Sequence, residues 1–83
     1  MSKPKPVKLT YFALLADQAG VPEEILLTQA ETCAQLYQEL QAKYGFALPL
    51  SHIRVAVNDA WVSLTHPLQP NDHVVFIPPV AGG

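Results

Sequence analysis

Apolar and polar residues alternate along several short stretches of this chain, and a period of two residues predicts β-strands with one buried face. The first such strand covers 7–12, and a second short apolar stretch at 23–28 is expected to pair back on it. Further strands are predicted at 53–57 and 60–63, and the run at 73–77 is almost wholly apolar. A nearly continuous apolar strand is typical of the middle of a sheet, where both faces are covered.

A stripe of apolar residues with helical spacing predicts one substantial helix between the second and third strands. Thr32 is the predicted N-cap because Thr32 and Gln35 have the spacing of a capping box, and Gly45 suits the left-handed residue that ends a helix. Thr28 with Glu31 is a second candidate for the start. The stripe consists of Cys33, Leu36, Tyr37, Leu40 and Tyr44.

The order of elements is strand, strand, helix and three further strands, with one or two turns of a short helix at 13–19. One main helix then has to cover one sheet, which is an α+β arrangement. A central last strand is expected to lie parallel to the first strand. The sequence therefore predicts a β-grasp (ubiquitin-like) roll with a mixed sheet at 7–77, preceded by a flexible arm at 1–6 and followed by an extended C-terminal Gly-Gly tail at 78–83.

Strand alternation divides the predicted sheet into a face that packs on the helix and an open face. Phe12 and Ile77 fall on the open face at neighbouring strand ends, and Trp61 joins them from the fourth strand. These three residues form a predicted docking surface for a partner. The alternative is that Phe12 and Trp61 fold under the connectors as a second small cluster. The predicted helix-facing set is Val7, Leu9, Tyr11, Ile53, Val55, Val57, Val74 and Phe76, and the open face also holds Lys8, Thr10, Arg54, Ala56, His73 and Val75.

Composition narrows the classes of function. The chain has 83 residues, 49% apolar and 14% charged, which suits one folded domain. Its formal net charge of −2 argues against nucleic acid as a partner, since phosphate binding requires a basic surface. The single cysteine, Cys33, leaves no intrachain disulfide and suits a reducing cytoplasm. No apolar run approaches the ~20 residues of a membrane span, and the lysines of the arm at 1–6 are expected to be solvated.

No group of side chains in the sequence forms a convincing catalytic or metal site. Cys33 lies within the apolar helix stripe, so a buried core thiol is favoured over a nucleophile. His52, His66 and His73, with Cys33 or Asp72, match no zinc-binding spacing. A Ser/His/Asp arrangement and a phosphate-binding glycine loop are also missing from the sequence. The C-terminal carboxyl group is what remains.

The tail is the candidate site. Pro78 and Pro79 lack N–H donors and stiffen the exit from the last strand, and Gly82 and Gly83 have no Cβ to obstruct a close approach. Fully extended, residues 80–83 reach about 13 Å, enough to cross a narrow channel in a partner. A terminal Gly-Gly can also be a disordered end or the remnant of an expression linker. After a β-grasp pattern and a Pro-Pro pair, the functional interpretation is favoured.

From about residue 7 to its end, the chain resembles the small subunit of molybdopterin synthase, a ubiquitin-like sulfur carrier of molybdenum cofactor biosynthesis. The ending Pro-Pro-Val-x-Gly-Gly is the most specific match. The matching segments are Tyr11-Phe12-Ala13, Ala56-Val57-Asn58, Val62-Ser63, His66-Pro67-Leu68 and 72–83. The sequence departs from the family at Ala16-Asp17, where an Arg-acidic pair is common, at His73, where an acidic residue is common, and at Ile77, where an aromatic residue is common.

The resemblance implies a chemistry for the tail. An E1-like activating enzyme uses ATP to adenylate the carboxylate of Gly83, and a sulfur donor converts the adenylate to a thiocarboxylate. The tail, Val80 to Gly83, then inserts into the large synthase subunit, and its sulfur passes to precursor Z (cyclic pyranopterin monophosphate). The resemblance also implies a heterotetramer of two small and two large subunits, with Phe12, Trp61 and Ile77 in the apolar contact. No cofactor is expected to be bound by the chain itself.

Two other functions stay open at this point. One is a related β-grasp carrier or protein modifier that serves thiazole synthesis, tRNA thiolation or lysine conjugation. The other is a pure interaction module whose tail is chemically inert. The Pro-Pro pair before the tail argues for the synthase.

Overall fold

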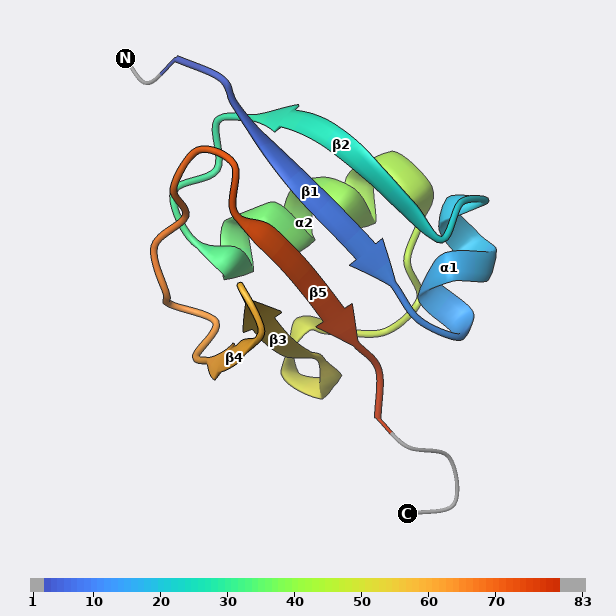
Figure 1. Ribbon diagram of the computed structural model, residues 1–83. Helices are drawn as coiled ribbons and strands as arrows, with labels where there is room; N and C mark the ends of the chain where they lie inside the picture. The colour runs from blue at the N-terminus through green and yellow to red at the C-terminus, as the bar shows by residue number, and fades with distance from the viewer. Residues whose placement is uncertain (1–2, 80–83) are drawn as a thin grey trace.

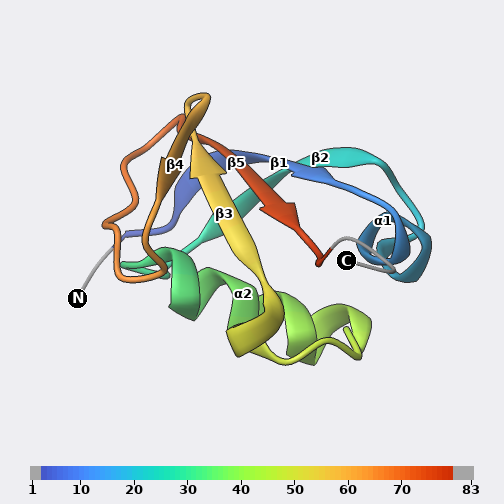
Figure 2. The ribbon, with the colours of Figure 1, turned by 90° about the horizontal axis from the view of Figure 1, so that it is seen from below.

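The fold, seen in a computed structural model that describes residues 3–79, is a twisted five-stranded sheet with a long helix lying across one face (Figures 1 and 2). The elements in chain order are β1 (Lys5–Tyr11), α1 (Leu14–Ala19), β2 (Glu23–Thr28), α2 (Cys33–Tyr44), the 3₁₀ turn η1 (Leu50–His52), β3 (Arg54–Val57), β4 (Ala60–Val62) and β5 (His73–Ile77).

The sheet has the strand order β2-β1-β5-β3-β4. β5 is the middle strand, and it runs parallel to β1, with Leu9 opposite Val74 and Tyr11 opposite Phe76. It runs antiparallel to β3 on its other side. The predicted mixed sheet of the β-grasp type, with the last strand central and parallel to the first, is confirmed.

The main helix begins and ends where the sequence predicts. The Thr32 side chain accepts a hydrogen bond from the Gln35 backbone N–H (3.2 Å), and Gly45 takes the left-handed conformation (φ 70°) that ends the helix. The Gln35 side chain in turn accepts from the backbone N–H of Glu31 (2.8 Å), one residue before the N-cap. Four of the five stripe residues are buried, and Tyr44 is partly buried.

Strand alternation produces the core. All eight residues of the predicted helix-facing set are buried. They pack on the apolar stripe of α2, as in the contact between the Tyr37 and Phe76 rings, whose centroids are 5.3 Å apart. Figure 2 shows α2 on one side of the sheet, while among residues 3–79 no helix covers the other side.

Both ends of β1 differ from the prediction, whereas α1, β3 and β4 are each one residue shorter than predicted. β1 begins at Lys5 because Lys5 and Pro6 pair with Thr28 and Leu27 of β2, so the predicted arm at 1–6 is too long. Met1 and Ser2 lie outside the described residues. β1 also ends at Tyr11, before Phe12. The cause is Ala13, whose φ of 51° turns the chain out of the strand and into α1.

Candidate functional site

The start of β5 is fixed by a buried carboxylate. Asp72 accepts hydrogen bonds from the Asn58 side-chain amide (2.9 Å) and from the Gln69 backbone N–H (2.8 Å). The Asn58 side chain also accepts from the backbone N–H of His73 (2.9 Å), the first residue of β5. These bonds join the two turns that precede β4 and β5, and they hold the first residue of β5 in place beside the β3–β4 turn.

The chain leaves the body directly from this central strand. Ile77 ends β5, Pro78 is partly buried beside it and Pro79 is exposed. Figure 1 shows the segment after β5 leading away from the sheet. The remaining predicted tail residues, Val80, Ala81, Gly82 and Gly83, lie outside the described residues.

An apolar depression lies where the tail leaves the body. It has a volume of about 580 Å³ and is lined by Arg54, Trp61, Ile77, Pro78 and Pro79, which we call the tail-exit patch. Arg54 stands opposite Ile77, and Trp61 stands opposite Ala56, so the side chains of Arg54, Trp61 and Ile77 share the open face of the sheet. Trp61 is 65% exposed and is therefore not folded under a connector.

Phe12 is only partly placed as the sequence predicts. Its side chain is 50% exposed and follows the end of β1, which lies next to the end of β5 through the pairing of Tyr11 with Phe76. Phe12 does not, however, line the tail-exit patch. The turn at Ala13 releases Phe12 from the strand alternation, so parity does not place its side chain.

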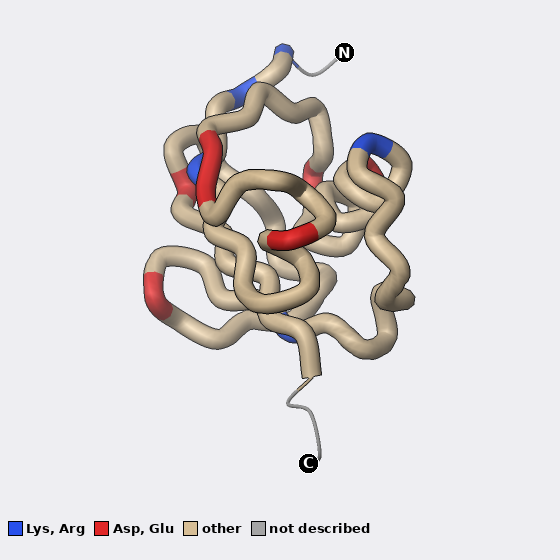
Figure 3. The backbone as a smooth tube through the Cα atoms, turned by 90° about the vertical axis from the view of Figure 1, so that its right-hand side faces the viewer, with Lys and Arg blue, Asp and Glu red and all other residues tan. Residues whose placement is uncertain are grey.

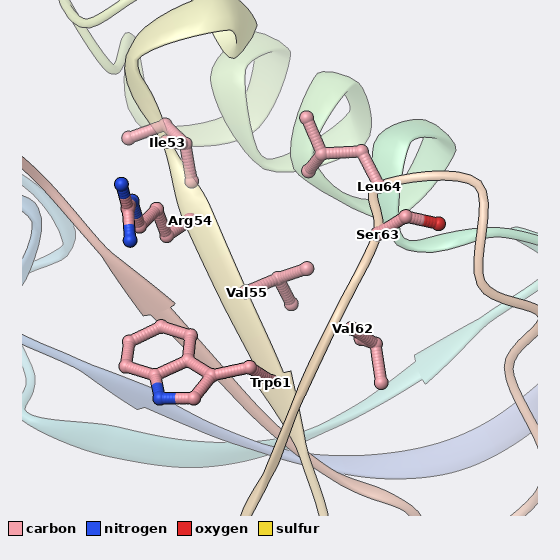
Figure 4. Close-up of a pocket in the computed structure, with 7 residues that line it drawn as sticks. All are labelled: Ile53, Arg54, Val55, Trp61, Val62, Ser63 and Leu64. Carbon is pink, nitrogen blue, oxygen red and sulfur yellow. The ribbon is translucent and has the colours of Figure 1, made fainter.

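Arg54 is a member of the patch that the sequence analysis did not select. Figure 4 shows its guanidinium and the Trp61 indole on the same side of the β3-β4 hairpin, with Val55 and Val62 on the other. Arg54 and Trp61 also line a second depression of about 370 Å³, formed by residues 53–55 and 61–64. The signal that identifies Arg54 is its register opposite Ile77, which requires knowledge of how β3 pairs with β5.

The other candidate residues form no reactive site. Cys33 is completely buried, and its burial, with a smaller effect of the Asp72 charge, raises the pKa of the thiol to about 11, so the thiol is protonated at neutral pH. His73 lies on the open face with Nε2 2.7 Å from the Thr10 hydroxyl. Within residues 3–79, no three His, Cys, Asp or Glu side chains gather in a way that could hold a metal ion. No helix in the same residues is long and apolar enough to cross a membrane.

Comparison with known proteins identifies the family. Residues 9–83 match the sequence model of the ThiS family. The chain belongs to the ThiS family. The match covers all five residues of the tail-exit patch and the Gly-Gly ending.

Named relatives in the family agree with the resemblance found in the sequence. The molybdopterin synthase sulfur carrier subunit of Escherichia coli K12 is 32% identical over 80 residues, covering 93% of this chain and 99% of that protein. The human molybdopterin synthase sulfur carrier subunit is 35% identical over 82 residues, covering 93% of each. A chain in the Helicobacter pylori complex of subunits 1 and 2 of molybdopterin-converting factor has a TM-score of 0.61 and 29% identity, covering 94% of this chain and 99% of that chain.

Proposed function

We propose that this protein is the sulfur carrier subunit of a molybdopterin synthase. One observation carries the proposal. The central strand of a β-grasp sheet leads into Pro78-Pro79 beside an exposed apolar patch, and the Gly-Gly ending follows within four residues. The two relatives that are named as sulfur carrier subunits support the same function.

The proposed chemistry takes place at the carboxylate of Gly83. An activating enzyme transfers AMP from ATP to this carboxylate and releases pyrophosphate. A sulfur donor then displaces AMP and leaves a thiocarboxylate, whose sulfur is later delivered to precursor Z (cyclic pyranopterin monophosphate). The body of the protein contributes binding and orientation, since its one thiol, Cys33, is buried and protonated. The reaction is expected in the cytoplasm.

The proposed partner is the large synthase subunit, in a heterotetramer of two small and two large subunits. The Helicobacter pylori complex of subunits 1 and 2 supports such a partner, because one of its chains shares this fold. In the proposed complex, the partner covers the tail-exit patch while residues 80–83 enter its active site. Trp61 and Ile77 supply the apolar contact, and Phe12 contributes from the neighbouring strand end.

The test is the intact mass of the protein after coexpression with its activating enzyme and sulfur donor. The expected result is a mass increase equal to the exchange of one oxygen for sulfur, located by fragmentation at Gly83. A protein lacking Gly83 is the control, and it should keep its original mass. Copurification of a large synthase subunit, and not of a thiazole synthase or a conjugation target, separates this function from those of related carriers. Reproducible absence of the mass change excludes every sulfur carrier function.

A further inference from the structure

Arg54 is the one charged side chain of the tail-exit patch. The other four members, Trp61, Ile77, Pro78 and Pro79, are apolar. Arg54 is exposed, and within the described part of the chain no carboxylate forms an ion pair or hydrogen bond with its guanidinium. Figure 3 shows acidic residues on several loops and elements of the tube, and none along the coloured end of the tube just before the grey trace to the C-terminus. The patch is therefore an apolar surface with a single unpaired positive charge.

A partner that covers this patch also removes water from Arg54. A desolvated guanidinium without a counter-ion is strongly unfavourable, whereas a carboxylate can pair with the planar guanidinium through two parallel hydrogen bonds. Arg54 lines the tail-exit patch and stands opposite Ile77 on the neighbouring strand, so a partner that covers the patch lies over both side chains. A suitable partner surface thus carries an acidic side chain among apolar groups.

We propose that Arg54 forms an ion pair with an Asp or Glu of the large synthase subunit, and that this pair selects the partner. The inference rests on the proposed function and adds the chemistry of the partner's surface to it. That surface presents one carboxylate toward Arg54, surrounded by apolar groups that fit Trp61 and Ile77. A large subunit with an apolar or basic residue at this point is rejected, because it leaves the guanidinium unpaired.

The experiment measures the dissociation constant of the carrier for the large subunit encoded in the same genome, by calorimetry. Arg54→Glu should raise it at least about 100-fold, because two carboxylates then face each other. Arg54→Met keeps an unbranched stem about as long as the methylene part of arginine but removes the guanidinium. It should raise the dissociation constant about 10-fold or more, since the partner's carboxylate loses its counter-ion. Arg54→Lys should stay within about 10-fold of the wild type because it retains the charge.

Lys8→Glu is the matched control. It makes the same charge change on the same face of the sheet, but at the other end of β5, where Lys8 stands opposite His73. Lys8→Glu should change the dissociation constant by less than about threefold, the range of long-range surface electrostatics.

Cross-linking identifies the partner residue. In the complex of the Arg54→Lys variant, a carbodiimide should join the lysine side chain at position 54 to an Asp or Glu of the large subunit through an amide bond.

Two results overturn the inference alone. One is that Arg54→Met binds the large subunit as tightly as the wild type does, while Trp61→Glu fails to bind it. In that case the contact is apolar and Arg54 does not contribute to it. The other is that Arg54→Glu weakens binding of the activating enzyme but not of the large subunit. If the wild-type carrier does not bind the large subunit at all, the inference and the proposed function are both wrong.

Discussion

Replacing Trp61 with alanine should separate binding from folding. A large aromatic side chain buries about 150–250 Å² when fully covered. Because 65% of Trp61 is exposed, roughly 100–160 Å² remain for a partner to cover, which at ~25 cal/mol per Å² is about 2.5–4 kcal/mol. The dissociation constant for the large subunit should therefore rise by about 60- to 700-fold. The part of Trp61 that is already covered within the chain is small, so Trp61→Ala should lower the free energy of unfolding by only about 1–2 kcal/mol.

Leu27→Ala is the matched control for this prediction. Leu27 is also 65% exposed, but it lies on β2, at the opposite edge of the sheet from β4. Leu27→Ala should lower the free energy of unfolding by a similarly small amount and leave the dissociation constant for the large subunit unchanged. Urea unfolding measures the first quantity and calorimetry the second. The reasoning fails if Trp61→Ala changes the dissociation constant by less than about fivefold, or if it unfolds the protein as a core substitution would.

Two further predictions concern the body that presents the tail. Asp72→Ala removes the acceptor of hydrogen bonds from Asn58 and Gln69, and it should lower the free energy of unfolding in urea by about 2–4 kcal/mol. Burial and the Glu24 carboxylate raise the pKa of Tyr44 from 10.0 to about 12. As the pH rises, the unfolded chain therefore loses the Tyr44 proton before the folded protein does. The free energy of unfolding should fall as the pH rises through that interval. Tyr44→Phe should make the decline shallower.

Each of these predictions has a control and a result that contradicts it. Asp59→Asn removes a carboxylate from the exposed turn between β3 and β4 and should change stability by less than about 0.5 kcal/mol. An equally small effect of Asp72→Ala would show that the buried carboxylate does not stabilise the start of β5. For Tyr44, the contradicting result is the same slope of stability against pH, between 10 and 12, in the wild type and in Tyr44→Phe.

Most of the fold follows from local patterns in the sequence. Alternation in β1 and β3 is enough to assign the buried face, because side chains in a strand point to opposite sides in turn. The near-continuous apolar run of β5 predicts its central place in the sheet. The capping pair Thr32 and Gln35 and the residue Gly45 fix the ends of α2 in the same local way.

The site was harder to predict because it depends on contacts between distant segments. The position of Phe12 depends on the positive φ of Ala13, which the residue type does not suggest. The place of Arg54 in the patch depends on the register between β3 and β5, which no local pattern determines. Ile77 could be assigned to the open face by counting in steps of two along β5, whereas the place of Trp61 depends on how β4 pairs with β3.

The most direct test of the account is sulfur transfer from the tail in a reconstituted synthase. Wild-type carrier, after treatment with the activating enzyme, ATP and a sulfur donor, is mixed with the large subunit and precursor Z, and formation of molybdopterin is measured. The account predicts product with the wild type and none with a folded protein that lacks Gly83. Equal product from the protein lacking Gly83, with an unchanged intact mass of the wild type, would contradict it.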